Sequence, residues 1–360
     1  MLPQLASLGW DADLDAAFAP YDRDGQRAAR ISRVDRSGFD LLDGRGPVRA
    51  TASGAVLAAS ARQSSAAPCV GDWAVLRRWP DARTTIEALL PRRTSLVRAA
   101  VRGQSQGQPL VANLDIAMLV EPLFPEPQLG RIERLLALAW QSGATPAIAL
   151  TKADMVSDAE DLRADVALAA PGVAVYVVSA TTGAGLGALA ELLLPGRTVA
   201  LVGPSGAGKS TLTNALSGQR SMATRELRAD GKGRHTTVHR ELIVLPGGGI
   251  VVDAPGLRSV GLFDAEAGLD RVFGDIEAVA GGCRFADCEH RSEPGCAVNA
   301  AIASGELPLR RLESWRRLQR EMRHMALRQD ARLRAAEIST WKRITKELRQ
   351  DQSSRRSRDR

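Results

Sequence analysis

The sequence predicts a multidomain chain in which a small β-barrel is followed by an α/β domain with a mostly parallel sheet and then by a helical region. Three observations predict this order. Short β-like runs separated by turn residues fill residues 29–98, strands alternate with helices from about residue 110 to 256, and three of the four cysteines lie within residues 283–296. Strand–helix alternation is typical of parallel sheets, whose ligand sites lie at the carboxyl ends of the strands.

Length and composition agree with several folded domains and argue against some protein classes. The chain has 360 residues, 44 % of them hydrophobic, which is enough for two or three cores. No apolar run approaches the length of a membrane span, and the start MLPQLASLGWDADLD lacks the pattern of a secretory signal. Four cysteines are too few for a disulfide framework. We therefore expect a cytoplasmic protein without a membrane partner, and we take it to be a monomer.

The net charge of +7 is concentrated at the C-terminal end. Residues 307–360 hold 17 Lys and Arg against 7 Asp and Glu, a net charge of +10, so the rest of the chain is slightly acidic. Such an end predicts a polyanionic partner such as nucleic acid, although a solvated, disordered tail explains the charge equally well. The last stretch, RQDQSSRRSRDR, lacks apolar residues and should be disordered when unbound.

The β-barrel prediction covers residues 29–98. Five short runs fit five strands, and SG, DGRG and VGD separate them as turn signals. This pattern favours an oligonucleotide-binding (OB) fold, with a generic β-domain as the alternative. Residues 1–28 show no clear periodicity and are expected to form a loose N-terminal extension. The five runs are RISRV at 30–34, FDLL at 39–42, PVRAT at 47–51, DWAVLRR at 72–78 and TTIEALL at 84–90.

The α/β domain follows the polar spacer RGQSQGQPL, and each of its candidate motifs stands at the end of a predicted strand. The helices are expected at residues 129–143 and 186–194, the first an amphipathic stretch stopped by glycine. The strands are LDIAMLV at 114–120, PAIAL at 146–150, VAVYVVSA at 173–180, TVALVG at 198–203 and GIVVDAPG at 249–256.

The stretch GPSGAGKST matches the phosphate-binding loop G-x-x-x-x-G-K-[ST] and follows a predicted strand. Its glycines let backbone N–H groups turn toward phosphates, Lys209 reaches the β- and γ-phosphates, and the Ser210 hydroxyl ligates Mg²⁺. A helix that begins near Lys209 adds its positive end. The loop consists of Gly203, Pro204, Ser205, Gly206, Ala207, Gly208, Lys209, Ser210 and Thr211.

The stretch TKAD has the residue types of a guanine-reading motif: Thr151, Lys152, Ala153 and Asp154. The Asp154 carboxylate can accept the N1–H and the exocyclic amine of guanine, and Lys152 can lie over the purine face. Thr151 replaces the commoner Asn, which changes how the loop is braced. An ordinary turn in which Asp154 caps a helix is the alternative.

Ser179 and Ala180 end the next strand, where a backbone amide can contact the guanine carbonyl. Asp253 can hold Mg²⁺ through water, and the Gly256 amide can touch the γ-phosphate. Thr236 or Thr237 can close over the metal, and Thr237 is the preferred switch threonine and magnesium ligand. Leu257 stands where many GTPases place a water-orienting glutamine, so His235 is the candidate catalytic residue, with an exposed loop histidine as the alternative.

The base-reading motif precedes the phosphate loop, which reverses the order of an ordinary guanine-nucleotide-binding domain. Each motif lies at the mouth of one sheet, so the spatial arrangement survives if the original termini are joined and the chain is cut elsewhere. We infer a circular permutation with the new cut after DAPG at 253–256.

Three thiols and one imidazole lie within fourteen residues, at Cys283, Cys288, His290 and Cys296. A Cys₃His set fits the closed tetrahedron of one structural zinc ion. Buried free cysteines beside a surface histidine are the alternative. Cys69 stands alone in the β-domain and is expected in its core.

This series of motifs resembles the ribosome small subunit-dependent GTPase A (RsgA) family over about residues 30–330, including VANLD at 111–115. The resemblance implies an OB-fold domain, a circularly permuted GTPase domain and a zinc-binding domain, and a role in late maturation of the small ribosomal subunit. Thr151 and Ala254 depart from the family's commoner Asn and Thr. The predicted divisions are residues 1–28 (extension), 29–98 (OB fold), 110–262 (permuted GTPase domain), 263–336 (zinc-binding helical domain) and 337–360 (basic tail).

The function expected from these residues is a GTP hydrolase, acting on an acid anhydride, that binds the small subunit and its rRNA and uses hydrolysis of GTP to GDP to time its release. The subunit should stimulate turnover. A P-loop ATPase or small-molecule kinase is one rival, against which Asp154 argues. A zinc-containing RNA-binding protein with a vestigial nucleotide site is the other, against which Lys209, Ser210 and Asp253 argue.

The sequence beyond the cysteines predicts a helix whose apolar stripe packs on one of the other domains. The stripe consists of Leu312, Trp315, Leu318, Met322 and Met325.

Overall fold

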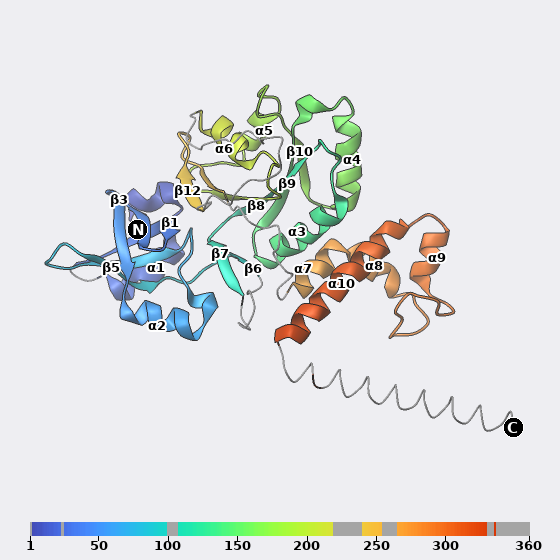
Figure 1. Ribbon diagram of the computed structural model, residues 1–360, viewed down its shortest axis with the longest axis horizontal. Helices are drawn as coiled ribbons and strands as arrows, with labels where there is room; N and C mark the ends of the chain where they lie inside the picture. Colours follow the sequence, from blue (N-terminus) through green and yellow to red (C-terminus); the bar gives the residue numbers. More distant parts are fainter. Residues whose placement is uncertain are drawn as a thin grey trace, which may run out of the picture.

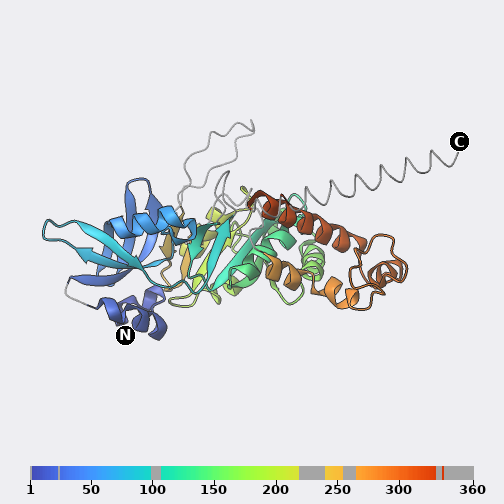
Figure 2. The ribbon, with the colours of Figure 1, turned by 90° about the horizontal axis from the view of Figure 1, so that it is seen from below.

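The computed structural model describes residues 2–22, 25–98, 107–218, 240–253, 265–329 and 335. Seen from below, the barrel lies at one end, the helices that follow residue 265 lie at the other, and the α/β sheet lies between them (Figure 2). Over the described residues, no helix is both long and apolar enough to cross a bilayer.

The barrel within residues 26–89 confirms the five predicted strands. Strand β1 (Gln26–Asp35) pairs with β2 (Gly38–Asp43) and β4 (Trp73–Arg78), β2 pairs with β3 (Gly46–Ala52), and β5 (Thr84–Leu89) closes the ring between β3 and β4. Inward residues such as Ile31, Leu41 and Ile86 are fully buried, as alternation along half-buried strands requires. Helix α2 (Gly54–Arg62), which the strand pattern did not predict, follows β3 and begins at Ser53, whose hydroxyl accepts the Val56 N–H.

The expectation of a loose N-terminal extension is wrong. A 3₁₀ helix η1 (Pro3–Leu8) and helix α1 (Ala12–Phe18) pack against the barrel, and a short turn η2 (Ala19–Tyr21) follows. The Trp10 ring meets the Trp73 ring edge-on with centroids 4.8 Å apart, and Leu14 and Phe18 join the same buried cluster. The segment is too short to show a helical period, yet its apolar side chains bury well against the outer face of β1 and β4, where Ala28, Trp73 and Val75 join the same cluster.

The α/β domain is built on a sheet in the order β10-β9-β8-β11-β13-β12. All neighbours are parallel except the antiparallel pair β12–β13. Although β8, β9 and β10 come first in the chain, they lie on one side of β11, and β13 lies on its other side, as the predicted permutation requires. The strands are β8 (Ile116–Pro122), β9 (Thr145–Thr151), β10 (Ala174–Val177), β11 (Thr198–Val202), β12 (Glu241–Val244) and β13 (Ile250–Asp253).

The helices of this domain lie on both faces of the sheet (Figure 1). The predicted amphipathic helix is α3 (Leu129–Gln141), and Gly143, in the left-handed region at φ 82°, follows its end. The turn η4 (Ala153–Met155) and helices α4 (Ala159–Ala169), α5 (Leu186–Ala190) and α6 (Lys209–Ser217) complete it.

Two connections join the barrel to the α/β domain. Strand β12 pairs with β1 through Glu241 and Arg33, so one sheet continues from the α/β domain into the barrel. A separate pair, β6 (Ser95–Arg98) with β7 (Gln108–Ala112), lies between the two, and η3 (Ser64–Ala66) lies against β7. A Cβ on Gly71 would lie 2.1 Å from the Ala112 carbonyl oxygen, so only glycine allows the barrel to approach β7 this closely.

The C-terminal helices are α7 (Glu266–Val272), α8 (Gly274–Ala280), α9 (Ala297–Ala303) and α10 (Leu309–Gln329). The predicted stripe on α10 is confirmed, because Leu312 and Leu318 are buried and Trp315 and Met322 pack against the core shared with α3. The predicted disordered tail at 337–360 lies outside the described residues.

Candidate functional site: a nucleotide cleft and a metal cluster

The phosphate loop leaves β11 at the centre of the sheet, between β8 and β13. A Cβ on Gly203 would lie 2.1 Å from the Val120 carbonyl oxygen, so the loop can pass β8 only with glycine there. Gly206 and Gly208 adopt φ values of 81° and 88°, in the region that favours glycine. The predicted helix α6 begins at Lys209. The loop therefore has the backbone shape that turns N–H groups toward phosphates.

Lys209 and Ser210 lie at the first turn of α6. The Lys209 ammonium is buried and donates to the carbonyl oxygens of Gly203 and Pro204, each over 2.9 Å. The Ser210 hydroxyl donates to Asp253 Oδ2 over 3.0 Å, which brings together the two predicted magnesium ligands.

Asp253 ends β13 and is 2 % exposed. Burial raises the pKa of its carboxyl, against the opposing effects of Lys209 and the Ser210 hydrogen bond. Its Oδ1 atom is buried and accepts no hydrogen bond from any residue that the structure describes. A hydroxyl and a carboxylate with a spare buried oxygen are the donor types that Mg²⁺ prefers, so these residues fit the ion that accompanies a nucleoside triphosphate.

The base-reading motif is brought directly against the phosphate loop. The Thr151 hydroxyl, at the end of β9, donates to the Ala207 carbonyl oxygen over 2.6 Å. TKAD and the phosphate loop are 56 residues apart at these two positions, yet they share one bond. The reversed motif order is therefore compatible with a single site.

Asp154 and Ser179 are also joined, in a way that the sequence reading missed. The Ser179 hydroxyl donates to Asp154 Oδ1 over 2.6 Å and accepts the Thr182 N–H over 3.1 Å. The Ser179 N–H donates to the Ala184 carbonyl oxygen over 2.9 Å, so it is already engaged within the protein. The sequence predicts a backbone contact for Ser179, whereas the structure shows its side chain bonded to the carboxylate of Asp154, the predicted base-reading residue.

Lys152 adopts φ 61° between Thr151 and the η4 turn, and its ammonium donates to the Phe124 carbonyl oxygen over 3.3 Å. Its aliphatic stem is thus tethered at the far end, which limits the positions it can take over a bound purine. His235, Thr236, Thr237, Gly256 and Leu257 lie outside the described residues, so their roles stay predictions.

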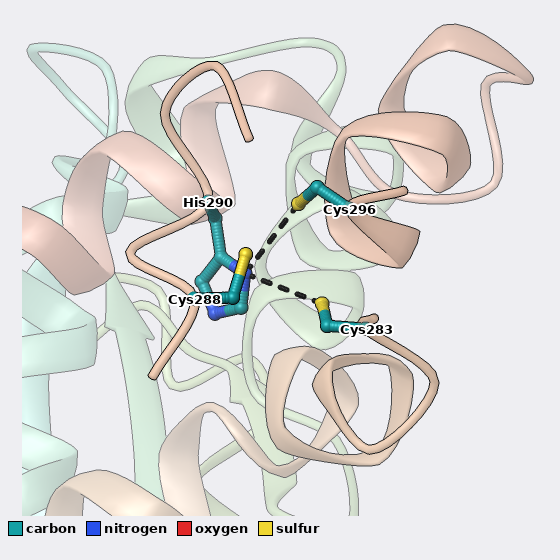
Figure 3. A group of neighbouring side chains, drawn as sticks. All are labelled: Cys283, Cys288, His290 and Cys296. Atoms are coloured by element: carbon teal, nitrogen blue, oxygen red, sulfur yellow. Dashed lines mark hydrogen bonds between the residues drawn. The ribbon is translucent and has the colours of Figure 1, made fainter. Parts of the chain in front are cut away.

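The second site is the predicted Cys₃His group. Figure 3 shows the four side chains pointing toward one another, and their ligand atoms lie within 4.8 Å of one another. The Sγ atoms of Cys283 and Cys296 are each 3.6 Å from His290 Nδ1. Tetrahedral zinc with its usual bond lengths separates a sulfur and a nitrogen ligand by about 3.6 Å, so the four residues fit this ion.

Short local contacts hold these ligands. Cys296 accepts the Asn299 N–H at the start of α9, and the Arg284 N–H bonds the Gly295 carbonyl to close the loop. His290 has φ 58°, and Arg316 on α10 donates to its carbonyl oxygen. Helix α10 therefore positions the imidazole from outside the loop.

The thiols have opposing pKa shifts. Desolvation is the largest single effect on Cys283 and raises its pKa, but hydrogen bonds from the N–H groups of Val298 and Ala297 and from the Cys288 and Cys296 thiols together lower the pKa below its ordinary value. The pKa of Cys288 is raised to about 11, first by desolvation and then by the neighbouring sulfurs. A divalent cation favours the thiolate form of every ligand and so opposes the second shift.

A family model described as RsgA GTPase matches residues 89–263. The chain is 50 % identical over 345 residues to the small ribosomal subunit biogenesis GTPase RsgA of Streptomyces avermitilis, covering 94 % of this chain and 91 % of that protein. It is 48 % identical over 343 residues to the protein of the same name from Streptomyces coelicolor, covering 94 % and 92 %.

Two solved structures resemble the fold. YjeQ from Thermotoga maritima matches with a TM-score of 0.60 and 26 % identity, covering 82 % of this chain and 98 % of that one. YloQ, described as a circularly permuted GTPase, matches with a TM-score of 0.57 and 26 % identity, covering 84 % of this chain and 97 % of that one. These matches confirm the permuted arrangement that the motif order predicts.

Proposed function

The chain belongs to the RsgA GTPase family, and we propose that it binds the small ribosomal subunit and its rRNA late in maturation and hydrolyses GTP to time its own release. It is a GTPase by family, and the joined nucleotide cleft supports the more detailed proposal. The observation that carries it is the bond from Thr151 to Ala207, which holds the base-reading and phosphate-binding motifs in one site.

Each part of the cleft has a role in this reaction. Asp154, oriented by Ser179, accepts the two donors of guanine, and Lys152 lies over its face. Lys209 exchanges its bonds with the Gly203 and Pro204 carbonyls for the β- and γ-phosphates. Ser210 and Asp253 would hold Mg²⁺, which neutralises charge on the phosphates.

The remaining predictions complete the proposal. Thr237 closes over the metal and Gly256 senses the γ-phosphate, while His235 acts in hydrolysis. Leu257 cannot orient water, so contacts with the subunit supply what the isolated site lacks. One structural zinc ion binds at the cluster of Cys283, Cys288, His290 and Cys296. The protein acts as a monomer in the cytoplasm, with the domain divisions set out above.

The deciding experiment measures GTP and ATP turnover with and without purified small subunits. We expect the protein to hydrolyse GTP faster than ATP. Small subunits should raise the rate of GTP hydrolysis by about tenfold or more, because the subunit completes the site. Large subunits serve as the control. A preference for ATP would support the kinase or ATPase alternative. GTP turnover that small subunits leave unchanged would contradict the ribosomal part of the proposal.

A further inference from the structure

The segment that leaves β8 runs beside the base-reading motif. Strands β8 and β9 pair in parallel, with Pro122 in register with Thr151. Beyond β8 the Leu123 N–H donates to the Thr151 carbonyl oxygen over 2.8 Å. The chain is therefore held against the first residue of TKAD at the mouth of the sheet.

Leu123 and Phe124 differ sharply in exposure. Leu123 is 1 % exposed in the core, whereas Phe124, the next residue, is 51 % exposed although its side chain is a large apolar ring. Exposing an aromatic ring to water is unfavourable, and a ligand that covers the ring recovers that free energy. The backbone carbonyl oxygen of Phe124 also accepts a hydrogen bond from the Lys152 ammonium, over 3.3 Å.

This contact decides which ligand could cover the ring. Lys152 is the residue that lies over the purine face in the proposed function, and Phe124 is tied to the end of that side chain. A nucleotide bound between Asp154 and the phosphate loop therefore passes next to Phe124. Every purine has an apolar face that stacks well on an aromatic ring.

We propose that Phe124 is a further nucleotide-binding residue, whose ring packs against the purine–ribose part of a bound guanine nucleotide beside Lys152. The inference rests on the proposed function, since it takes the nucleotide to be GTP or GDP. Asp154 then discriminates guanine by hydrogen bonds, and Phe124 adds affinity without discriminating between bases.

The test compares Phe124→Ala, Phe124→Trp and the control Leu168→Ala, which removes an exposed apolar side chain 75 % exposed on α4. Binding of GDP, GTP and inorganic tripolyphosphate is measured by calorimetry on the full chain. We expect Phe124→Ala to weaken GDP and GTP binding about tenfold, as loss of one stacking contact does, and Phe124→Trp to retain it. Tripolyphosphate has no base, so its affinity should stay unchanged in every variant.

Two results would overturn the inference. Wild-type affinity of Phe124→Ala for GDP would show that the ring touches no nucleotide, and equal losses for GTP and tripolyphosphate would show a distorted phosphate loop instead. Failure of the proposed function looks different, because the wild-type protein would then bind ATP as well as GTP. Thermal melting of each variant, with Phe124→Trp as the aromatic replacement, separates misfolding from loss of binding.

Discussion

Thr151 stands where guanine-reading motifs more often carry asparagine, and its hydroxyl donates to the Ala207 carbonyl oxygen over 2.6 Å. A residue at this position must supply a donor to the phosphate loop, and the threonine hydroxyl does so. Ser179 likewise joins two segments with one side chain, because its hydroxyl donates to Asp154 and accepts the Thr182 N–H. Small polar side chains thus hold together a site whose parts are distant in sequence.

At Asp154 we predict that Asp154→Asn weakens GTP binding by about 2–4 kcal/mol, because an amide cannot accept both guanine donors. Xanthosine triphosphate should partly restore affinity, since its base offers a complementary oxygen. Fluorescent-nucleotide titration measures both constants. The control is Asp158→Asn, a nearby exposed carboxylate without a capping bond; unchanged GTP affinity in Asp154→Asn would mean that TKAD is only a turn.

Asp253 makes a prediction about pH. Its folded pKa is raised above the ordinary value of 3.8, so the fold favours the protonated form. The stability of the nucleotide-free protein should therefore fall as pH rises from that value through the raised pKa. Asp253→Asn should remove this part of the pH dependence and abolish Mg²⁺-dependent GTP binding.

Thermal melting of the nucleotide-free protein between pH 4 and 7 checks the predicted fall in stability. Asp165→Asn, which alters an exposed carboxylate, is the control. A steeper pH dependence in Asp253→Asn than in the wild type would contradict it.

Among the elements, α3 and α10 are joined by a buried ion network. Glu133 on α3 is fully buried and accepts hydrogen bonds from Arg310, Arg311 and Ser314 on α10. Arg311 also donates twice to Asp275 on α8, over 2.7 and 3.0 Å. The helical region is thus fastened to the α/β domain independently of the linker that leads into it.

We predict that Glu133→Gln destabilises the protein by about 2–4 kcal/mol, because it leaves the buried guanidinium group of Arg311 partly uncompensated. Glu160→Gln on α4 is the matched control, since Glu160 forms only an exposed pair with Arg163 and should change stability by less than about 0.5 kcal/mol. Urea unfolding of both variants provides the comparison. If the urea midpoint of Glu133→Gln equalled that of the wild type, the packing of α10 on α3 would need no charge pairing.

The metal cluster predicts that Cys288→Ser, or a strong chelator, releases one zinc ion and loosens residues 283–296, since metal binding supplies much of a small module's folding free energy. GTP binding should survive, because the phosphate loop lies on another element. Elemental analysis measures the zinc content, and hydrogen exchange measures the loosening of residues 283–296. The control is Cys69→Ala, which alters a buried cysteine outside the cluster, and this variant should keep zinc at the cluster. Protein purified from cytoplasmic expression without zinc would rule out the metal assignment.

Across the whole molecule, two routes lead from the nucleotide to the flanking domains. Residues 257–282 connect the DAPG segment to the first cluster cysteine. The sheet itself is the other route, since Asp253 pairs with Glu241 and Glu241 pairs with Arg33 of the barrel. Backbone pairing therefore connects Asp253 to the barrel through β12, a connection that the motif order did not predict.

We predict that GTP tightens and GDP weakens binding to the small subunit, by a coupling of about 1–3 kcal/mol, because γ-phosphate contacts change the disposition of both flanking domains. Affinities in GDP and in a non-hydrolysable GTP analogue, measured at one salt concentration, test this, since phosphate contacts make binding salt-sensitive. Lys209→Ala, which loses the phosphate contact, should show no dependence on nucleotide. Equal affinities of the wild type in the two states would exclude the coupling.

Features set by local spacing were determined by the sequence alone. Alternation predicted all five barrel strands, the glycine pattern predicted a loop followed by a helix at Lys209, and fourteen residues were enough to bring the Cys₃His group together. Neighbouring residues fix such features because turn geometry and periodicity act over a few positions.

Only the tertiary structure decided the contacts between distant segments. Trp10 lies on Trp73, Glu133 meets Arg311, and Glu241 pairs with Arg33, none of which follows from spacing. Burial of apolar area and pairing of buried charges choose among many packings, and their outcome depends on surfaces that exist only once the elements have formed. The N-terminal segment shows this most clearly, because it has no period to read and the outer face of β1 and β4 supplies the surface against which it packs.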